Sequence, residues 1–150
     1  PFCVHGGDHP EGHGGIDIEL REKTRILSAV DGEVVMIEKG GEGEAHGIMI
    51  ETGDFIVGYY GITDVRVREG EKVRKGDLIG FPAQLDEGEH FIHFEINDYK
   101  NKQLACPLPY LDDSFQNNLE YKLNNASYIE QEKEPNLCNC ESLPYKRSMG

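Results

Sequence analysis

The chain has 150 residues and a formal net charge of −13, from 15 Lys and Arg against 28 Asp and Glu. This length suits one ordinary domain and excludes a second full one. The negative charge repels a phosphate backbone, so no nucleic-acid partner is expected. With 37% hydrophobic residues, 18 glycines and no apolar stretch of about 20 residues, the chain is expected to be turn-rich and to have no membrane span.

From residue 15 to residue 97 apolar and polar residues alternate in short runs, a pattern typical of β-strands. The predicted strands cover residues 16–20, 34–37, 48–50, 55–60 and 91–96. Glycine and aspartate mark turns between them, at residues 31–32, 40–41, 53–54, 69–70 and 75–77. Connections this short favour an antiparallel arrangement. The predicted fold class is therefore all-β, a twisted antiparallel sheet.

Beyond residue 111 the composition shifts to Asn, Glu, Gln and Ser, and the strand pattern is lost. Pro135 and Pro144 interrupt this part. We therefore expect one domain over residues 1–111 and a polar, cysteine-containing, irregular C-terminal tail over residues 112–150.

Four cysteines and one glycosylation sequon bear on the compartment. An even set of four cysteines allows three disulfide pairings, and the sequon is typical of secreted proteins. The chain begins at Pro1 without a charged and apolar leader, so any targeting peptide is expected to have been removed or to lie outside this sequence. These features favour an extracellular, periplasmic or cell-surface location. The cysteines are Cys3, Cys106, Cys138 and Cys140, and the sequon covers residues 125–127.

Two histidines and one aspartate form the candidate chemical site. His13 and Asp17 are four residues apart, but the intervening glycine pair disfavours a helix, so His13 belongs to a loop and Asp17 to the polar face of the following strand. In the strand over residues 91–96, alternation places His93 on the face opposite the apolar side chains. Taken singly, each is more typical of a solvated polar residue. Together, two imidazoles and one carboxylate suit Zn²⁺.

The surrounding segments resemble the lysostaphin-type, LytM-like zinc endopeptidases, which cut peptide cross-links of bacterial cell walls. The resemblance covers roughly residues 9–110. It implies a barrel-sandwich-like LytM peptidase fold, with zinc held by His13, Asp17 and His93. The segments that carry it are the first motif at 13–17, a strand pair from 28–35, a late hairpin at 65–80, the end of a His-x-His-Phe-Glu strand at 93–95, and the exit at 106–111.

Two positions depart from the family pattern. Phe91 stands where the resemblance implies the first His of the His-x-His pair, and Ile62 stands where it implies a histidine after the middle-strand tyrosine. Those two histidines act on the water and the transition state, and proton transfer and oxyanion stabilisation each contribute about 10²-fold or more. His90 adjoins Phe91, but in a regular strand it faces the other side, and only a bulge would bring it to the metal.

The sequence therefore predicts a zinc-binding domain that is catalytically impaired and acts as a binding or regulatory module for a peptide, cell-wall or protein ligand. The alternative is an active metalloendopeptidase on cell-wall or Gly-rich peptides, with His90 or His9 as the base. A third class, a carrier or phosphotransfer domain of barrel-sandwich type, would use Lys39, which lacks the flanking residues of such domains.

Other residues receive weaker predictions. His5 is expected in a solvated loop and His46 receives no function, while Tyr59 or Tyr60 can hydrogen-bond to a ligand. One disulfide is expected to join Cys3 to Cys106, because they flank the first motif and the last strand and the bond would tie the ends of the domain together. Cys138 and Cys140 are then left for each other or for a partner.

Overall fold

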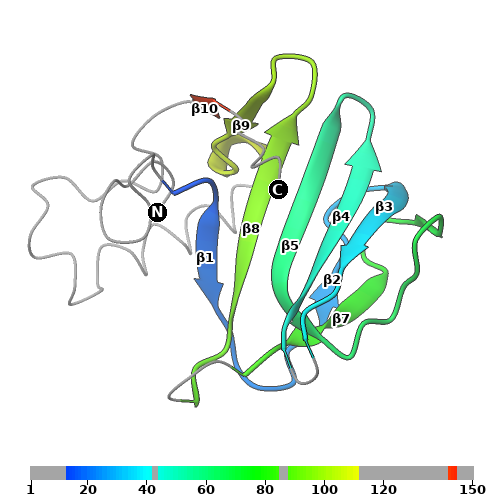
Figure 1. Ribbon diagram of the computed structural model, residues 1–150, viewed down its shortest axis with the longest axis vertical. Coiled ribbons are helices and arrows are strands. Elements are labelled where there is room, and N and C mark those ends of the chain that lie inside the picture. The colour runs from blue at the N-terminus through cyan, green and yellow to red at the C-terminus, as the bar shows by residue number, and fades with distance from the viewer. Residues whose placement is uncertain (1–12, 42–43, 85–87, 112–141, 145–150) are drawn as a thin grey trace, which may run out of the picture.

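The computed structural model describes residues 13–41, 44–84, 88–111 and 142–144. These residues form a strongly twisted β-sheet with one short 3₁₀ turn, η2 (Leu108–Tyr110) (Figure 1). The strands are β1 (Ile16–Glu19), β2 (Ile26–Leu27), β3 (Gly32–Glu38), β4 (His46–Thr52), β5 (Phe55–Thr63), β6 (Lys72–Val73), β7 (Leu78–Pro82), β8 (Phe91–Asp98), β9 (Gln103–Ala105) and β10 (Ser142–Pro144).

The sheet follows the order β10-β9-β8-β5-β4-β3-β6, with β1 paired to β8, and β7 paired to β5 and β2. Every pairing among these strands is antiparallel, which confirms the predicted fold class. The five predicted strands correspond to β1, β3, β4, β5 and β8. They were predictable because each is long enough to show period-2 alternation between a buried and a more exposed face.

One expectation about pairing was wrong. The segment over residues 65–80 is not a hairpin in which β6 and β7 pair, because β6 pairs with β3 while β7 pairs with β2 and β5. Both strands are short and pair with strands distant in sequence, and local turn residues do not reveal such pairing. Of the tail the structure describes residues 142–144, which form β10 and pair with β9 at the edge of the sheet.

The hydrophobic core covers one face of the sheet and includes residues from β2 and β7 as well as from the long strands. Its fully buried side chains include Ile16, Val34, Ile48, Ile50 and Ile79. On β8, Ile92, Phe94 and Ile96 point into this core, whereas Phe91, His93 and Glu95 alternate with them and are only half-buried. No helix among the described residues is long and apolar enough to cross a membrane.

Candidate metal centre

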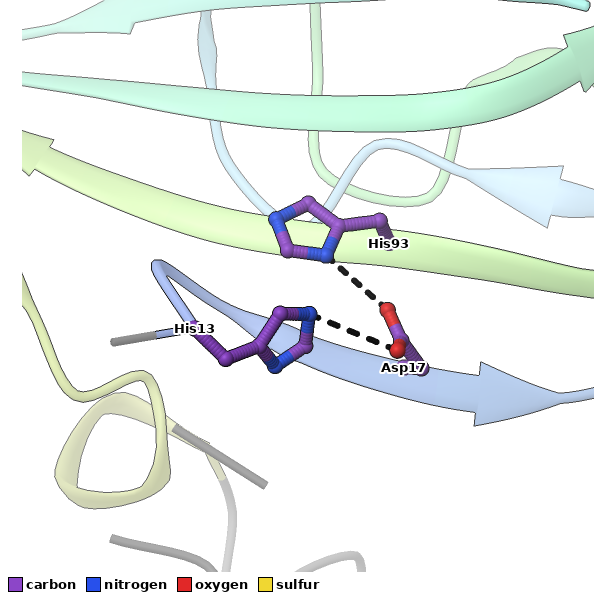
Figure 2. Close-up of side chains that lie close together, drawn as sticks. All are labelled: His13, Asp17 and His93. Atoms are coloured by element: carbon purple, nitrogen blue, oxygen red, sulfur yellow. Dashed lines mark hydrogen bonds and ion pairs between the residues drawn. The ribbon is translucent and has the colours of Figure 1, made fainter. Parts of the chain in front are cut away.

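The centre is built where β1 pairs with β8 and Asp17 lies directly opposite His93. Asp17 Oδ1 is 2.9 Å from His93 Nδ1. His13, in the loop before β1, approaches from the other side, with its Nε2 3.4 Å from Asp17 Oδ2. Figure 2 shows both imidazoles turned toward the same carboxylate. The structure thus brings the three predicted ligands together.

Gly15 explains why glycine separates the two ligands of the first segment. A Cβ at this position would lie 2.3 Å from the Phe94 carbonyl oxygen and 2.7 Å from His93 Nε2. Only glycine lets the chain pass this close to β8 while leaving room for the His93 ring. The His13 ring meets the His93 ring edge-on, with centroids 4.7 Å apart, and His13 is itself buried.

The three ligand atoms, one from each residue, all lie within 4.8 Å of one another. Two ring nitrogens and a carboxylate oxygen at this separation match the donor set that a zinc-type transition metal accepts. His93, Asp17 and His13 can therefore hold one metal ion without a change in sheet register.

Glu95 and Tyr60 lie beside His93, and Asn97 contacts Glu95. Glu95 Oε2 is 3.6 Å from His93 Nε2. Glu95 Oε1 accepts hydrogen bonds from the Tyr60 hydroxyl and from Asn97 Nδ2, both at 2.9 Å. A carboxylate that contacts the second nitrogen of a ligand histidine fixes the orientation of its ring. Sequence reasoning did not assign Glu95 or Asn97 a role, although they follow His93 by two and four residues and therefore lie on its face of β8.

Mutual interactions shift the pKa values of this group. Burial by itself would lower the pKa of His93, but hydrogen bonds to Asp17 and Glu95 outweigh it and raise this pKa to about 9. Burial by itself would raise the pKa of Asp17, yet His13 and His93 hold it well below its usual range. Burial by itself would also raise the pKa of Glu95, but interactions with His93, Asn97 and Tyr60 outweigh burial and lower this pKa. Both carboxylates are therefore ionised and suited to a cation.

The family assignment follows from a match between this chain and the model of peptidase family M23, which covers residues 11–105. The matched span contains β1 to β9 and all three ligands. The chain belongs to peptidase family M23.

Similar proteins agree with this M23 assignment. The chain is 26% identical over 137 residues to glycyl-glycine endopeptidase ALE-1 of Staphylococcus capitis, covering 85% of the chain and 36% of that protein. It thus spans about a third of the length of this curated relative. The catalytic domain of lysostaphin from Staphylococcus simulans matches with a TM-score of 0.59 at 18% identity, over 73% of this chain and 86% of that one. LytU matches with a TM-score of 0.60 at 22% identity, over 73% and 79%. These structures establish the LytM-type fold.

The two departures from the family pattern lie in different environments of this M23 domain. Phe91 shares the outward face of β8 with His93. Ile62 is fully buried in the hydrophobic core. In a regular strand it would share the face of Tyr60, but Gly61 has φ +88° and no partner in β4, because Ile62 pairs with His46 and Tyr60 with Gly47. This bulge turns the Ile62 side chain inward.

Of the other histidines, the structure describes His46 and His90, and neither of them is part of the centre. His90 precedes β8 in an isolated bridge with Gln84, and the β1–β8 register has no shift, so the bulge that would turn His90 to the metal is not formed. His46 Nδ1 accepts a hydrogen bond from the Gly40 amide. His5 and His9 lie outside the described residues.

Three further predictions concern the cysteine pairing, Lys39 and the two tyrosines. Cys106 is buried at the end of the domain, but its expected partner Cys3 lies outside the described residues, as do Cys138 and Cys140, so the pairing stays a prediction. Lys39 is exposed and follows the end of β3. Of the two tyrosines, Tyr60 contacts the centre, whereas Tyr59 is buried in the core.

Proposed function

We propose that this M23 domain binds one zinc ion through His13, Asp17 and His93 and works as a binding or regulatory module with impaired peptidase activity. The convergence of these three ligands, with Phe91 on the face of His93, is the observation that supports it. The ligand is a peptide, a cell-wall fragment or a protein segment bound in a groove, and the domain over residues 1–111 works outside the cytoplasm.

Zinc, when bound, supplies Lewis-acid polarisation of a peptide carbonyl. Hydrolysis also needs a base for the proton of the attacking water and a donor to the developing oxyanion. Phe91 offers neither, and Ile62 is an apolar side chain buried in the core. Among the described residues near the centre, Glu95 is engaged by Tyr60 and Asn97, and it orients His93.

The alternative function is an active metalloendopeptidase on cell-wall or Gly-rich peptides, with His90 or His9 as the base. The similarity to a glycyl-glycine endopeptidase favours it. The pairing of β8 with β1 argues against this alternative, because it leaves His90 on the same side as Ile92, away from His93.

The test measures zinc and turnover on the same 150-residue chain. Purified without chelator, the chain should hold one zinc per molecule by elemental analysis. His93→Ala should weaken zinc binding more than about 100-fold because a ligand is lost, while His90→Ala, three residues away, should keep the metal. A full equivalent of zinc in His93→Ala would refute the ligand assignment.

The zinc-loaded protein should cleave pentaglycine and cell-wall peptides no faster than His93→Ala does. Robust turnover that His90→Ala abolishes would overturn the impaired-enzyme proposal in favour of the alternative. Robust turnover that survives in His90→Ala would overturn it too and would leave His9, or another base, to be located by further substitution.

A further inference from the structure

The strand β1 lies at one side of the sheet and exposes an edge beside the metal centre. Among the described residues it pairs only with β8, and Figure 1 shows no described strand beyond it. Asp17, whose side chain is 47% exposed, and the exposed Glu19 lie in this strand. An open strand edge presents main-chain N–H and C=O groups that can pair with another chain.

The hydrogen bonds between β1 and β8 identify the main-chain groups at this edge. The Leu20 amide donates to the His90 carbonyl at 2.8 Å, directly after the paired residues Glu19 and Phe91. Hydrogen-bonded and non-hydrogen-bonded pairs alternate in an antiparallel ladder, and this register has no shift. Glu19 and Asp17 therefore belong to the pairs that do not bond across to β8. Their N–H and C=O groups point away from β8, and these groups form no hydrogen bond with another described residue.

The inward face of β1 supplies an apolar strip along the same edge. Ile18 and Leu20 pack against the core but are only half-buried, whereas Ile92, directly opposite Ile18 on β8, is 6% exposed. The strip thus keeps accessible apolar surface on the side away from β8. A strand added at this edge would cover that surface, and burial of apolar surface favours association.

Charge argues against a second copy of this chain at the edge. When two β1 strands pair antiparallel around Ile18, Asp17 of one copy lies opposite Glu19 of the other on the same face. Like charges directly opposite each other are destabilising, and each copy carries a net charge of −13. A peptide without acidic side chains avoids this repulsion.

We propose that the edge of β1 binds an extended, non-acidic peptide as an added antiparallel strand, which deepens the peptide-binding role proposed above and rests on it. Asp17 and Glu19 recognise the peptide through the N–H and C=O groups of their main chains. The peptide residue opposite Asp17 has its side chain on the outward face, where the Asp17 carboxylate lies between His13 and His93. Main-chain pairing of this kind gives affinity for an extended shape, so the edge holds a peptide beside the metal centre.

The experiment titrates the zinc-loaded 150-residue chain with a fluorescent peptide, acetyl-Gly-Thr-Val-Thr-Val-Gly-amide, and with two N-methylated forms of it. The valines are expected to pack on the apolar strip of Ile18 and Leu20, which turns the threonines to the outward face. In an antiparallel ladder the residues that bond to Asp17 and Glu19 share the face of these residues. The threonine amides therefore face β1, and the valine amides face solvent.

Methylation of both threonine amides should weaken binding at least about 10-fold, because it removes donors to β1, and methylation of both valine amides should weaken it less than about threefold. Equal losses, a larger loss with methylated valines, or no binding of any of these peptides would overturn the proposal.

Amide hydrogen exchange and two proline variants locate the site. Peptide binding should slow exchange of the Asp17 and Glu19 amides. Glu19→Pro removes an N–H that faces away from β8 and should weaken binding at least about 10-fold. Lys72→Pro is the matched control at the other edge of the sheet, where the Val34 amide donates to the Glu71 carbonyl and the next amide, that of Lys72, likewise faces away from β3. It should change the affinity less than about twofold.

Equal losses in both proline variants, or protection confined to amides outside β1, would refute the site. The methylated peptides and hydrogen exchange use the unsubstituted chain, so they decide the question even where Glu19→Pro unfolds.

Zinc content and molecular mass are measured on each sample. One equivalent of zinc without a greater loss for the methylated threonines overturns this inference alone. That greater loss in protein that binds no zinc overturns the proposed metal role and leaves the edge assignment standing. A dimer that Glu19→Pro dissociates would assign the edge to a second copy and overturn the peptide proposal.

Discussion

The two faces of β8 are built from the same eight residues, yet they are buried in different ways. Inward, Ile92, Phe94 and Ile96 are 5–6% exposed and contact only the apolar core. Outward, His93 and Glu95 lose much of their exposure through ion pairs and hydrogen bonds with Asp17, Tyr60 and Asn97. The inward face contributes stability, because apolar burial needs no particular partner.

The outward face of β8 shows how polar side chains are paired on a half-buried strand. A buried polar group costs free energy unless it is paired, so both imidazoles lie beside the Asp17 carboxylate and His93 also lies beside Glu95. On this face the carboxylate of Asp17, between His13 and His93, is the group that the proposed metal would use. Substitutions on the inward face should therefore lower the stability of the fold, whereas substitutions on the outward face should mainly change binding.

The largest difference in the loss of stability is expected between substitutions of two phenylalanines of β8. Phe94 is 6% exposed and packs edge-on against Tyr59, with ring centroids 5.3 Å apart, so Phe94→Ala should lower the free energy of unfolding by about 3–5 kcal/mol. Phe91 is half-buried on the outward face, and Phe91→Ala should cost about 1 kcal/mol. Urea unfolding of both variants with zinc chelated gives the comparison. Equal losses would contradict the assignment of the two faces.

On β5, Tyr59 lies on the inward, buried face of the strand and Tyr60 lies on the outward face. Burial raises the pKa of Tyr59 to about 12 from 10.0, although the Ala29 amide donates to its hydroxyl at 2.8 Å. The unfolded chain ionises this phenol near pH 10, whereas the folded chain keeps it neutral until about pH 12. The stabilisation is thus fully present below pH 10 and is lost as pH rises through 12, a difference of about 2–3 kcal/mol.

Denaturant unfolding between pH 9 and 12 tests this. Tyr59→Phe removes the group and should flatten the alkaline fall in stability by about 2 kcal/mol. Phe94→Leu, which alters the ring packed against Tyr59 but removes no titrating group, is the control: it should lower the stability at every pH and retain the slope of the unsubstituted protein. A slope unchanged in Tyr59→Phe would show that other groups cause the alkaline loss.

The long strands, and the outward direction of Asp17 and His93, could be predicted because both depend on local alternation. His93 faces outward for the same reason that Phe94 faces inward, and the resemblance supplied its distant partners. The position of Ile62 could not be predicted in this way, since one glycine at φ +88° reverses the alternation after Tyr60. Nothing in the local pattern distinguishes such a bulge from a regular strand residue.

Long-range pairing limited the remaining predictions. The strands β6 and β7 pair with distant strands and not with each other, and β10 returns from the tail to β9. For the same reason, the sequence did not reveal which polar side chains bond to one another. That Asn97 donates to Glu95 and keeps an unpaired Oδ1 depends on three-dimensional placement rather than on residue type.

The smallest expected effect concerns the support that Glu95 gives to His93, one of the three proposed metal ligands. Glu95→Gln keeps the shape and still accepts from Tyr60, but it removes the charge 3.6 Å from His93 Nε2. Groups that orient a ligand histidine typically account for about 10- to 100-fold in metal affinity. Because the glutamine retains an acceptor, the loss should be near 10-fold, or about 1.4 kcal/mol. Competition with a fluorescent zinc chelator measures this loss.

Glu19→Gln is the control for this substitution. It removes an equal charge from the face of β1 that carries Asp17, two residues away and outside the group bonded to His93. It should change zinc affinity less than twofold at 0.15 M salt. Similar losses in both variants would mean that zinc responds to the net charge of the face and that Glu95 has no specific role in holding His93.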